Sequence, residues 1–217
     1  MSDAFDVGAV RSLQRRTVFA RSTDAPMLVL GSTQGSALVD RRALARHGVA
    51  LVRRRSGGGA VLLEPERSVW LDTWVPRGDP LWEDDVARSR LWVGEWWSEV
   101  LDDGAVTHRG GPVSSKWSDA VCFAGLDAGE VTWRHRKVVG VAQWRGKEGS
   151  LTHSMAYVEA DWSVVAALLG LGPGAATELQ SMTATVAEAG WPDPHDLVDR
   201  LIGALPAGPT WDIRRNG

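Results

Sequence analysis

Two residues stand out for the chemistry that they could perform. The chain has one cysteine, Cys122, and three lysines, of which Lys137 begins an apolar run. A thiolate can carry an acyl group as a thioester, and a lysine that enters an apolar strand can point into a pocket and hold an anionic ligand group. The alternatives are a buried structural cysteine and an exposed lysine at a strand end.

A third candidate is the segment of residues 53–59, RRRSGGG. Three consecutive glycines let the backbone approach a ligand closely and present N–H groups that no side chain shields. Arginines just before them supply positive charge for a carboxylate or a phosphate. The alternative is a glycine-rich hairpin turn with solvated arginines, because such loops also match by chance.

Composition excludes several classes of function. One cysteine rules out an internal disulfide and a multi-cysteine metal cluster, and the five histidines show no metal-ligand pairing, so we expect no metal site. A net charge of −3 argues against a general nucleic-acid binder. The sequence lacks both the roughly 18-residue apolar run of a membrane helix and the apolar core of a secretory signal. We therefore expect a cytoplasmic protein with no membrane or nucleic-acid partner.

The elements that must position these residues are read from periodicity and from glycine and proline breakers. We expect strands at residues 26–31, 49–52, 60–63, 68–75 and 150–158, and two more within residues 131–144. The strands at 60–63 and 68–75 are expected to form a hairpin. Helices are expected at residues 36–47, 84–101, 163–169, 177–188 and 194–205.

This order of elements predicts an α+β fold: a single domain, residues 1–217, with a mixed central β-sheet flanked by helices. Its C-terminal part, from about residue 161, is expected to be helical, and no accessory domain is expected.

Taken together, the two motif segments resemble a known family. RRRSGGGAV at residues 53–61, followed by RKVVGVAQWR at residues 136–145, is similar to the paired signature of lipoate–protein ligase A and the octanoyltransferases. LVLGSTQ at residues 28–34 resembles the strand and turn before the family's ligand pocket. The likeness covers roughly residues 26–160 and implies the biotin/lipoate protein ligase fold.

The resemblance also implies an activity, which is to attach a lipoyl or octanoyl group to a lysine of a lipoyl domain or of the glycine-cleavage H protein. Lys137 matches the family lysine that neutralises the acyl carbonyl and phosphate, and Gly140 and Ala142 match small residues of the acyl tunnel. The loop around the acyl carboxylate or its adenylate would comprise Arg53, Arg54, Arg55, Ser56, Gly57, Gly58 and Gly59.

Cys122-Phe123 resembles a dipeptide of the octanoyltransferase branch, in which the thiolate takes the acyl chain from an acyl carrier protein. The alternative is an ATP-dependent ligase that uses magnesium and passes through lipoyl-AMP. We expect Trp117, Trp133 and Trp144, which flank the motifs, to line the acyl slot.

Three departures from the family pattern weaken the ligase alternative. Leu63-Glu64 stands where relatives have His-Asp, and His153-Ser154 stands where they have His-Gly. The Asn-Asp pair that helps to hold magnesium is not recognisable, with Asp119 the nearest candidate. The accessory domain that the ligases usually carry is also not expected here. These gaps leave a non-catalytic acyl-binding paralogue as a further alternative. A biotin ligase is disfavoured because its usual loop is replaced by RRRSGGG.

Overall fold

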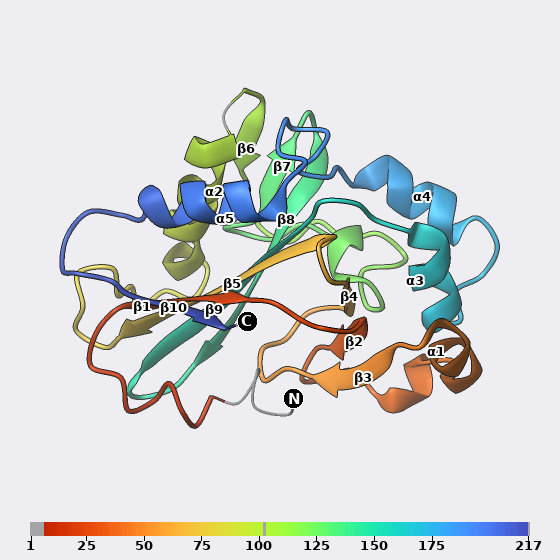
Figure 1. Cartoon of the computed structure of the whole chain (residues 1–217), viewed down its shortest axis with the longest axis horizontal. Coiled ribbons are helices and arrows are strands. Elements are labelled where there is room, and N and C mark those ends of the chain that lie inside the picture. Colours follow the sequence, from red (N-terminus) through yellow and green to blue (C-terminus); the bar gives the residue numbers. More distant parts are fainter. Residues whose placement is uncertain (1–6, 102, 217) are drawn as a thin grey trace.

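Two β-sheets organise the computed structural model, which describes residues 7–101 and 103–216 (Figure 1). The large sheet has seven strands in the order β10-β1-β5-β9-β8-β7-β6, and the small sheet has the order β3-β2-β4. The large sheet comprises β1 (Thr17–Arg21), β5 (Ser68–Pro76), β6 (Ala105–Thr107), β7 (Val131–Trp133), β8 (Arg136–Arg145), β9 (Gly149–Tyr157) and β10 (Asp212–Asn216). The small sheet comprises β2 (Met27–Leu30), β3 (Ala50–Arg53) and β4 (Val61–Leu63).

Both sheets are mixed, because β10 runs parallel to β1 and β3 runs parallel to β2, while the other pairings are antiparallel. The α-helices are α1 (Arg41–His47), α2 (Leu91–Leu101), α3 (Trp162–Leu168), α4 (Ala175–Met182) and α5 (Pro194–Gly203). Short 3-10 helices are η2 (Ser36–Leu38), η3 (Arg88–Arg90) and η4 (Cys122–Ala124). Within the described residues, no helix has the length and apolar content to span a bilayer.

The two faces of the large sheet bury different hydrophobic cores. Helices α2 and α5 cover one face, where Trp97 and Leu201 pack on apolar strand residues such as Val139 (Figure 1). The other face carries Trp70 and packs against the small sheet, with α1, α3 and α4 beyond it. Side chains alternate between the faces of a strand, so β8 and β9 place one set of residues under the helices and the next set toward the small sheet.

The predicted α+β fold with a mixed central sheet and flanking helices is confirmed. The predicted hairpin of residues 60–63 and 68–75 is wrong, since β4 pairs with β2 while β5 pairs with β1 and β9. The turn between them carries the chain from one sheet to the other, which local turn signals do not reveal.

Other predictions differ from the structure at the ends of elements. The helix predicted from residue 84 begins with η3 at Arg88, and the helix predicted to reach residue 188 ends at Met182. The C-terminal part is not wholly helical, because β10 returns to the large sheet. The first six residues, on which part of the N-terminal prediction falls, lie outside the described residues.

Candidate active site

The two motif segments meet at one surface hollow of about 460 Å³, called the basin below. Gly57, Gly58 and Gly59 form one wall, while Lys137 and Ala142 of β8 form another. Cys122 lines the hollow from η4. Segments far apart in the sequence therefore line one hollow.

A short stretch of backbone pairing joins the glycine loop to the cysteine. Ala60 N–H donates to Ala120 O at 2.8 Å, and Cys122 N–H donates to Ala60 O at 3.0 Å. The approach is so close that a Cβ atom placed on Gly59 would lie 2.5 Å from the Cys122 nitrogen. Glycine at position 59 is thus required to seat the loop beside η4.

Cys122 is partly buried, and its thiol lies against the middle of β8. A Cβ atom on Gly140 would be 3.4 Å from the Cys122 Sγ, so the missing side chain at that position leaves room for the sulfur. The neighbouring Phe123 is buried and packs against Tyr157, with ring centroids 4.8 Å apart. This packing fixes the backbone on which the thiol is carried.

Lys137 is buried, and its ammonium group is fully hydrogen bonded. Its Nζ donates to Cys122 O at 2.7 Å and to Gly125 O at 2.9 Å, and it lies 2.7 Å from Glu130 Oε2. An ammonium has three N–H donors, so each has an acceptor. Lys137 therefore holds the main chain of the cysteine segment, and contact with an acyl carbonyl requires exchange of one of these partners.

Glu130 is a site residue that was not predicted from the sequence. Only 4% of it is exposed, and besides binding Lys137 it accepts from Asp127 N at 2.8 Å and from Val141 N at 3.2 Å. The available signal was a lone acidic residue beside β7, the strand that pairs with the lysine's own strand. Without the register of that pairing, the signal does not identify a partner.

The three arginines before the glycines play different parts. Arg53 Nη1 donates to Gly31 O at 2.9 Å, and to the carbonyls of Ser32 and Gln34. Arg54 is buried, and its guanidinium donates to Gly57 O at 2.7 Å and to Gly59 O at 2.9 Å.

Arg54 thus braces the glycine loop, whereas Arg53 holds the turn of residues 31–34. Of residues 53–59, only the three glycines line the basin. Burial lowers the pKa of the Arg54 guanidinium, although the neighbouring Cys122 opposes that shift. Ser56 is also buried, within the loop, while Arg55 is exposed. Contact of Arg53, Arg54, Arg55 or Ser56 with an acyl head group stays a prediction.

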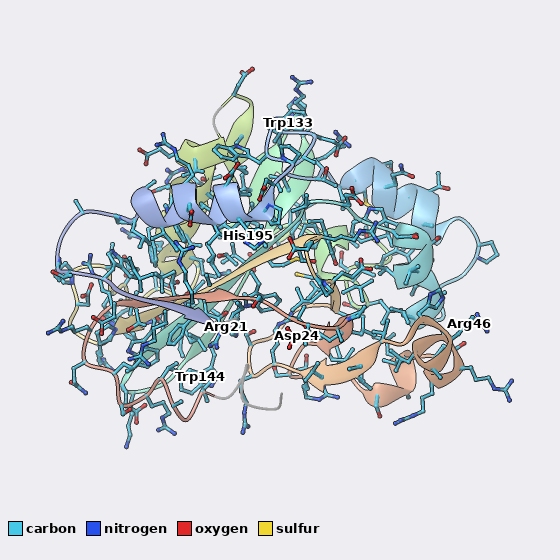
Figure 2. All side chains as sticks on the ribbon, in the orientation of Figure 1. Arg21, Asp24, Arg46, Trp133, Trp144 and His195 are labelled. Carbon is cyan, nitrogen blue, oxygen red and sulfur yellow. The ribbon has the colours of Figure 1, made fainter. Side chains whose placement is uncertain are left out.

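Beside the cysteine lies a small cavity, called the acyl slot below. Its lining is mainly apolar and comprises Arg54, Val61, Trp70, Cys122, Phe123, Gly140, Ala142, His153 and Met155. Both small residues predicted for the tunnel, Gly140 and Ala142, are present. The predicted Trp117, Trp133 and Trp144 are not, and Figure 2 shows the last two on opposite sides of the molecule. The tryptophan of the slot is Trp70.

A buried charge network supports the slot. Asp72 Oδ1 accepts from Trp70 Nε1 at 2.6 Å and lies 2.6 Å from His153 Nδ1, while Arg21 Nε donates to Oδ2 at 2.8 Å. Burial by itself opposes ionisation of Asp72, but these partners outweigh it and hold the pKa of the carboxyl below its ordinary value. His153 is therefore anchored by a carboxylate.

The acidic residues of the basin do not present a magnesium site. Asp127 binds Arg90 at 2.9 Å and Glu130 binds Lys137, so cations of the chain already engage both carboxylates. Within the part of the chain that the structure describes, no three His, Cys, Asp or Glu residues converge as metal ligands. Asp119 lines the basin without a second carboxylate free to share an ion with it.

Comparison with known families finds one match. Residues 8–188 match the family described as the lipoyl protein ligase A/B catalytic domain. A comparison with proteins of curated function gives no match.

Solved structures share the fold. A putative lipoate protein ligase from T. acidophilum with bound lipoic acid has a TM-score of 0.71 and 18% identity, over 95% of this chain and 78% of that one. A bipartite lipoate protein ligase from Thermoplasma acidophilum, studied with its E2 lipoyl domain, has a TM-score of 0.74 and 19% identity, over 98% and 80%. A lipoate-protein ligase A bound with ATP has a TM-score of 0.71 and 17% identity, over 93% and 76%.

Proposed function

Since the chain belongs to the lipoyl protein ligase A/B catalytic domain family, we propose that it transfers a lipoyl or octanoyl group to a lysine of a carrier domain through a thioester on Cys122. The observation that carries the proposal is the shared basin: Cys122, Lys137 and the glycine loop face one another there. Bound lipoic acid in one relative and the E2 lipoyl domain studied with another support the acyl class and the acceptor.

In the first step, the Cys122 thiolate attacks the carbonyl of a donor thioester such as an acylated acyl carrier protein. A new carbon–sulfur bond forms, the carbon–sulfur bond of the donor breaks, and the donor thiolate takes up the proton that Cys122 lost on ionisation. Within the described residues, the N–H groups of Gly57 and Gly58 have no protein acceptor, so they are available to stabilise the oxyanion. Lys137 adds positive charge beside the same carbonyl when its ammonium exchanges one of its present partners.

In the second step, the amine of the carrier lysine attacks the acyl-Cys122 carbonyl. The carbon–sulfur bond breaks as the amide forms, and the proton that the amine releases returns to the thiol. The basin is open to solvent on the side of the glycine loop, where Gly57 and Gly58 are exposed, so an incoming lysine side chain has access.

An ATP-dependent ligase is the second candidate, favoured by the structural likeness to an ATP-bound ligase. The carboxylates of the basin do not fit a magnesium ion, so we derive no step through lipoyl-AMP. The thioester route needs no metal ion, and the residues of the basin can perform it.

The proposal is tested by incubating the protein with octanoyl-acyl carrier protein, and separately with lipoate, ATP and magnesium, each with an apo-lipoyl domain. Intact mass is read on both proteins. We expect an octanoyl adduct on the wild type, its loss in Cys122→Ser, and transfer of the octanoyl group to the lipoyl domain. Lys147→Ala, which changes an exposed lysine outside the basin, is the matched control for a Lys137→Met variant.

ATP-dependent lipoylation that survives Cys122→Ser would replace the thioester route with the ligase route. If octanoate binds but neither product forms, the protein is the non-catalytic acyl-binding paralogue and the proposal fails.

A further inference from the structure

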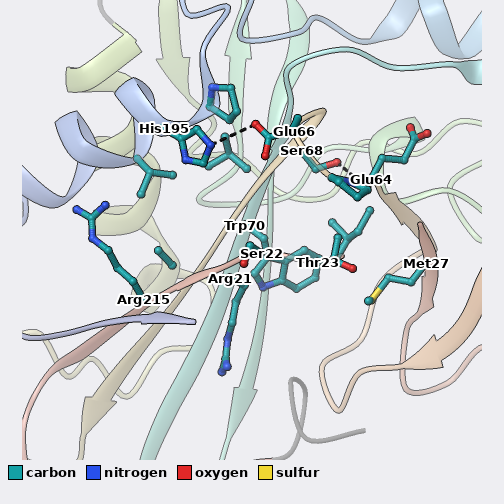
Figure 3. A pocket seen from close by; sticks show the side chains of 16 residues that line it. Arg21, Ser22, Thr23, Met27, Glu64, Glu66, Ser68, Trp70, His195 and Arg215 are labelled. Carbon is teal, nitrogen blue, oxygen red and sulfur yellow. Dashed lines mark hydrogen bonds and ion pairs between the residues drawn. The ribbon is translucent and has the colours of Figure 1, made fainter. Parts of the chain in front are cut away.

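Trp70 separates the acyl slot from a second cavity on its far side. This outer cavity has a volume of about 250 Å³ and lies between the β1–β2 loop, the β4–β5 turn and the start of α5 (Figure 3). Among the described residues, Trp70 is the one side chain that lines both cavities. Trp70 is therefore the partition between them.

The two cavities differ greatly in capacity. The acyl slot has a free volume of about 10 Å³, which is no more than one water molecule needs. An octanoyl or lipoyl chain attached to Cys122 cannot fit in that space. The outer cavity has room, and Met27, Leu63 and Val198 give it apolar walls. At its rim, His195 Nε2 lies 3.2 Å from Glu66 Oε2 (Figure 3).

The partition is held in place by a specific bond. Trp70 is 4% exposed, and its Nε1 donates to Asp72 Oδ1 at 2.6 Å. Because Arg21 and His153 also bind that carboxylate, the acceptor itself is fixed. The His153 ring, with its centroid 5.5 Å from that of Trp70, packs beside the indole. Moving the indole therefore costs a buried hydrogen bond as well as packing.

We propose that Trp70 determines the length of acyl chain that Cys122 accepts. With the indole in place, the slot admits only the first carbons of a chain. On the side of the cysteine away from the basin, a longer chain is housed only when the indole leaves its position, and the tail then lies in the outer cavity. The inference rests on the proposed function in taking Cys122 as the acyl acceptor.

The test uses the chain's only cysteine and requires no turnover. Alkyl methanethiosulfonates convert the Cys122 thiolate to an alkyl disulfide and release methanesulfinate, and intact mass follows the rate. We compare methyl, butyl and octyl reagents on the wild type, Trp70→Phe and Trp70→Ala. In the wild type, we expect the octyl reagent to be at least about tenfold slower than the methyl reagent, since an apolar pocket of this small volume rejects added methylenes.

Trp70→Ala should remove most of that discrimination. Trp70→Phe, with a smaller ring and no N–H donor, should discriminate between chain lengths less than the wild type and more than Trp70→Ala. Trp97→Ala is the matched control, because Trp97 is a buried tryptophan of the core on the opposite face of the large sheet and does not line the slot. It should keep the wild-type profile, and thermal unfolding confirms that each variant is folded.

The proposal is overturned if wild type and Trp70→Phe show the same dependence on chain length, or if the wild type shows none. Failure of the proposed function has a different signature, namely no acyl transfer to the lipoyl domain while the alkylation rates still change with Trp70. If Trp70→Ala does not fold, the comparison of Trp70→Phe with the wild type is sufficient.

Discussion

The ammonium of Lys137 joins two roles that are usually separate. It holds the carbonyls of Cys122 and Gly125 in place, and it neutralises the buried Glu130 carboxylate. The same charge is proposed to face an acyl carbonyl in the basin. A loss of activity in a Lys137 variant would therefore not separate catalysis from structure, and a second substitution is needed to do so.

Lys137→Met should destabilise the protein by about 3–5 kcal/mol, because it leaves Glu130 charged and buried without its partner. The double variant Lys137→Met/Glu130→Gln removes both charges and should recover most of that loss. Urea unfolding measures both effects. If Lys137 also acts on the acyl carbonyl, the double variant is stable but forms the Cys122 adduct slowly. Full recovery of adduct formation would limit Lys137 to a structural role.

Among the elements, the glycine loop and η4 are positioned by each other. Gly59→Ala places a Cβ atom 2.5 Å from the Cys122 nitrogen, so the Ala60–Val121 pairing has to shift. We expect slower adduct formation on Cys122 and a lower urea midpoint. Gly57→Ala is the matched control, since a Cβ atom there meets nothing within 4 Å. Equal effects of the two substitutions would contradict this account of the loop.

At the scale of elements, the strands and helix starts that depend on local sequence pattern could be predicted from the sequence. The strands β2, β3, β8 and β9 and the start of α5 lie where periodicity and breakers indicate, and the two motifs meet in one basin. Glu130 and Trp70 were not predicted as site residues, because their roles depend on strand register across the large sheet. The β4–β5 hairpin was predicted wrongly for the same reason, since partner choice is a tertiary property.

For the whole molecule, the free energy of unfolding should decrease as the pH falls. In the folded protein, burial raises the pKa of Asp72, but the interactions with His153, Arg21 and Trp70 lower it by more, so the net shift is downward. Hydrogen bonds from backbone amides lower the pKa of the helix cap Asp40. Groups whose pKa is lower in the folded state stabilise it above their unfolded pKa and lose that contribution as pH falls.

We therefore expect the free energy of unfolding to be nearly constant from neutral pH to about pH 5 and to fall at lower pH. Asp72→Asn should be less stable than the wild type at neutral pH, with a gap that narrows on acidification. Urea midpoints over this range test the prediction. Asp24→Asn, in the exposed β1–β2 loop (Figure 2), is the control. If the difference in stability between Asp72→Asn and the wild type does not change with pH, the lowered pKa of Asp72 is contradicted.

The two sheets draw on the chain in different ways, and this has a consequence for the order of folding. The small sheet is complete within one continuous stretch, residues 27–63, whereas the large sheet pairs β1 with β10 at the opposite end of the chain. Contacts between distant segments form late because loop closure is costly. During synthesis, the small sheet and its glycine loop can assemble early, whereas the cysteine, the lysine and the edge strand join them only as the later segments emerge.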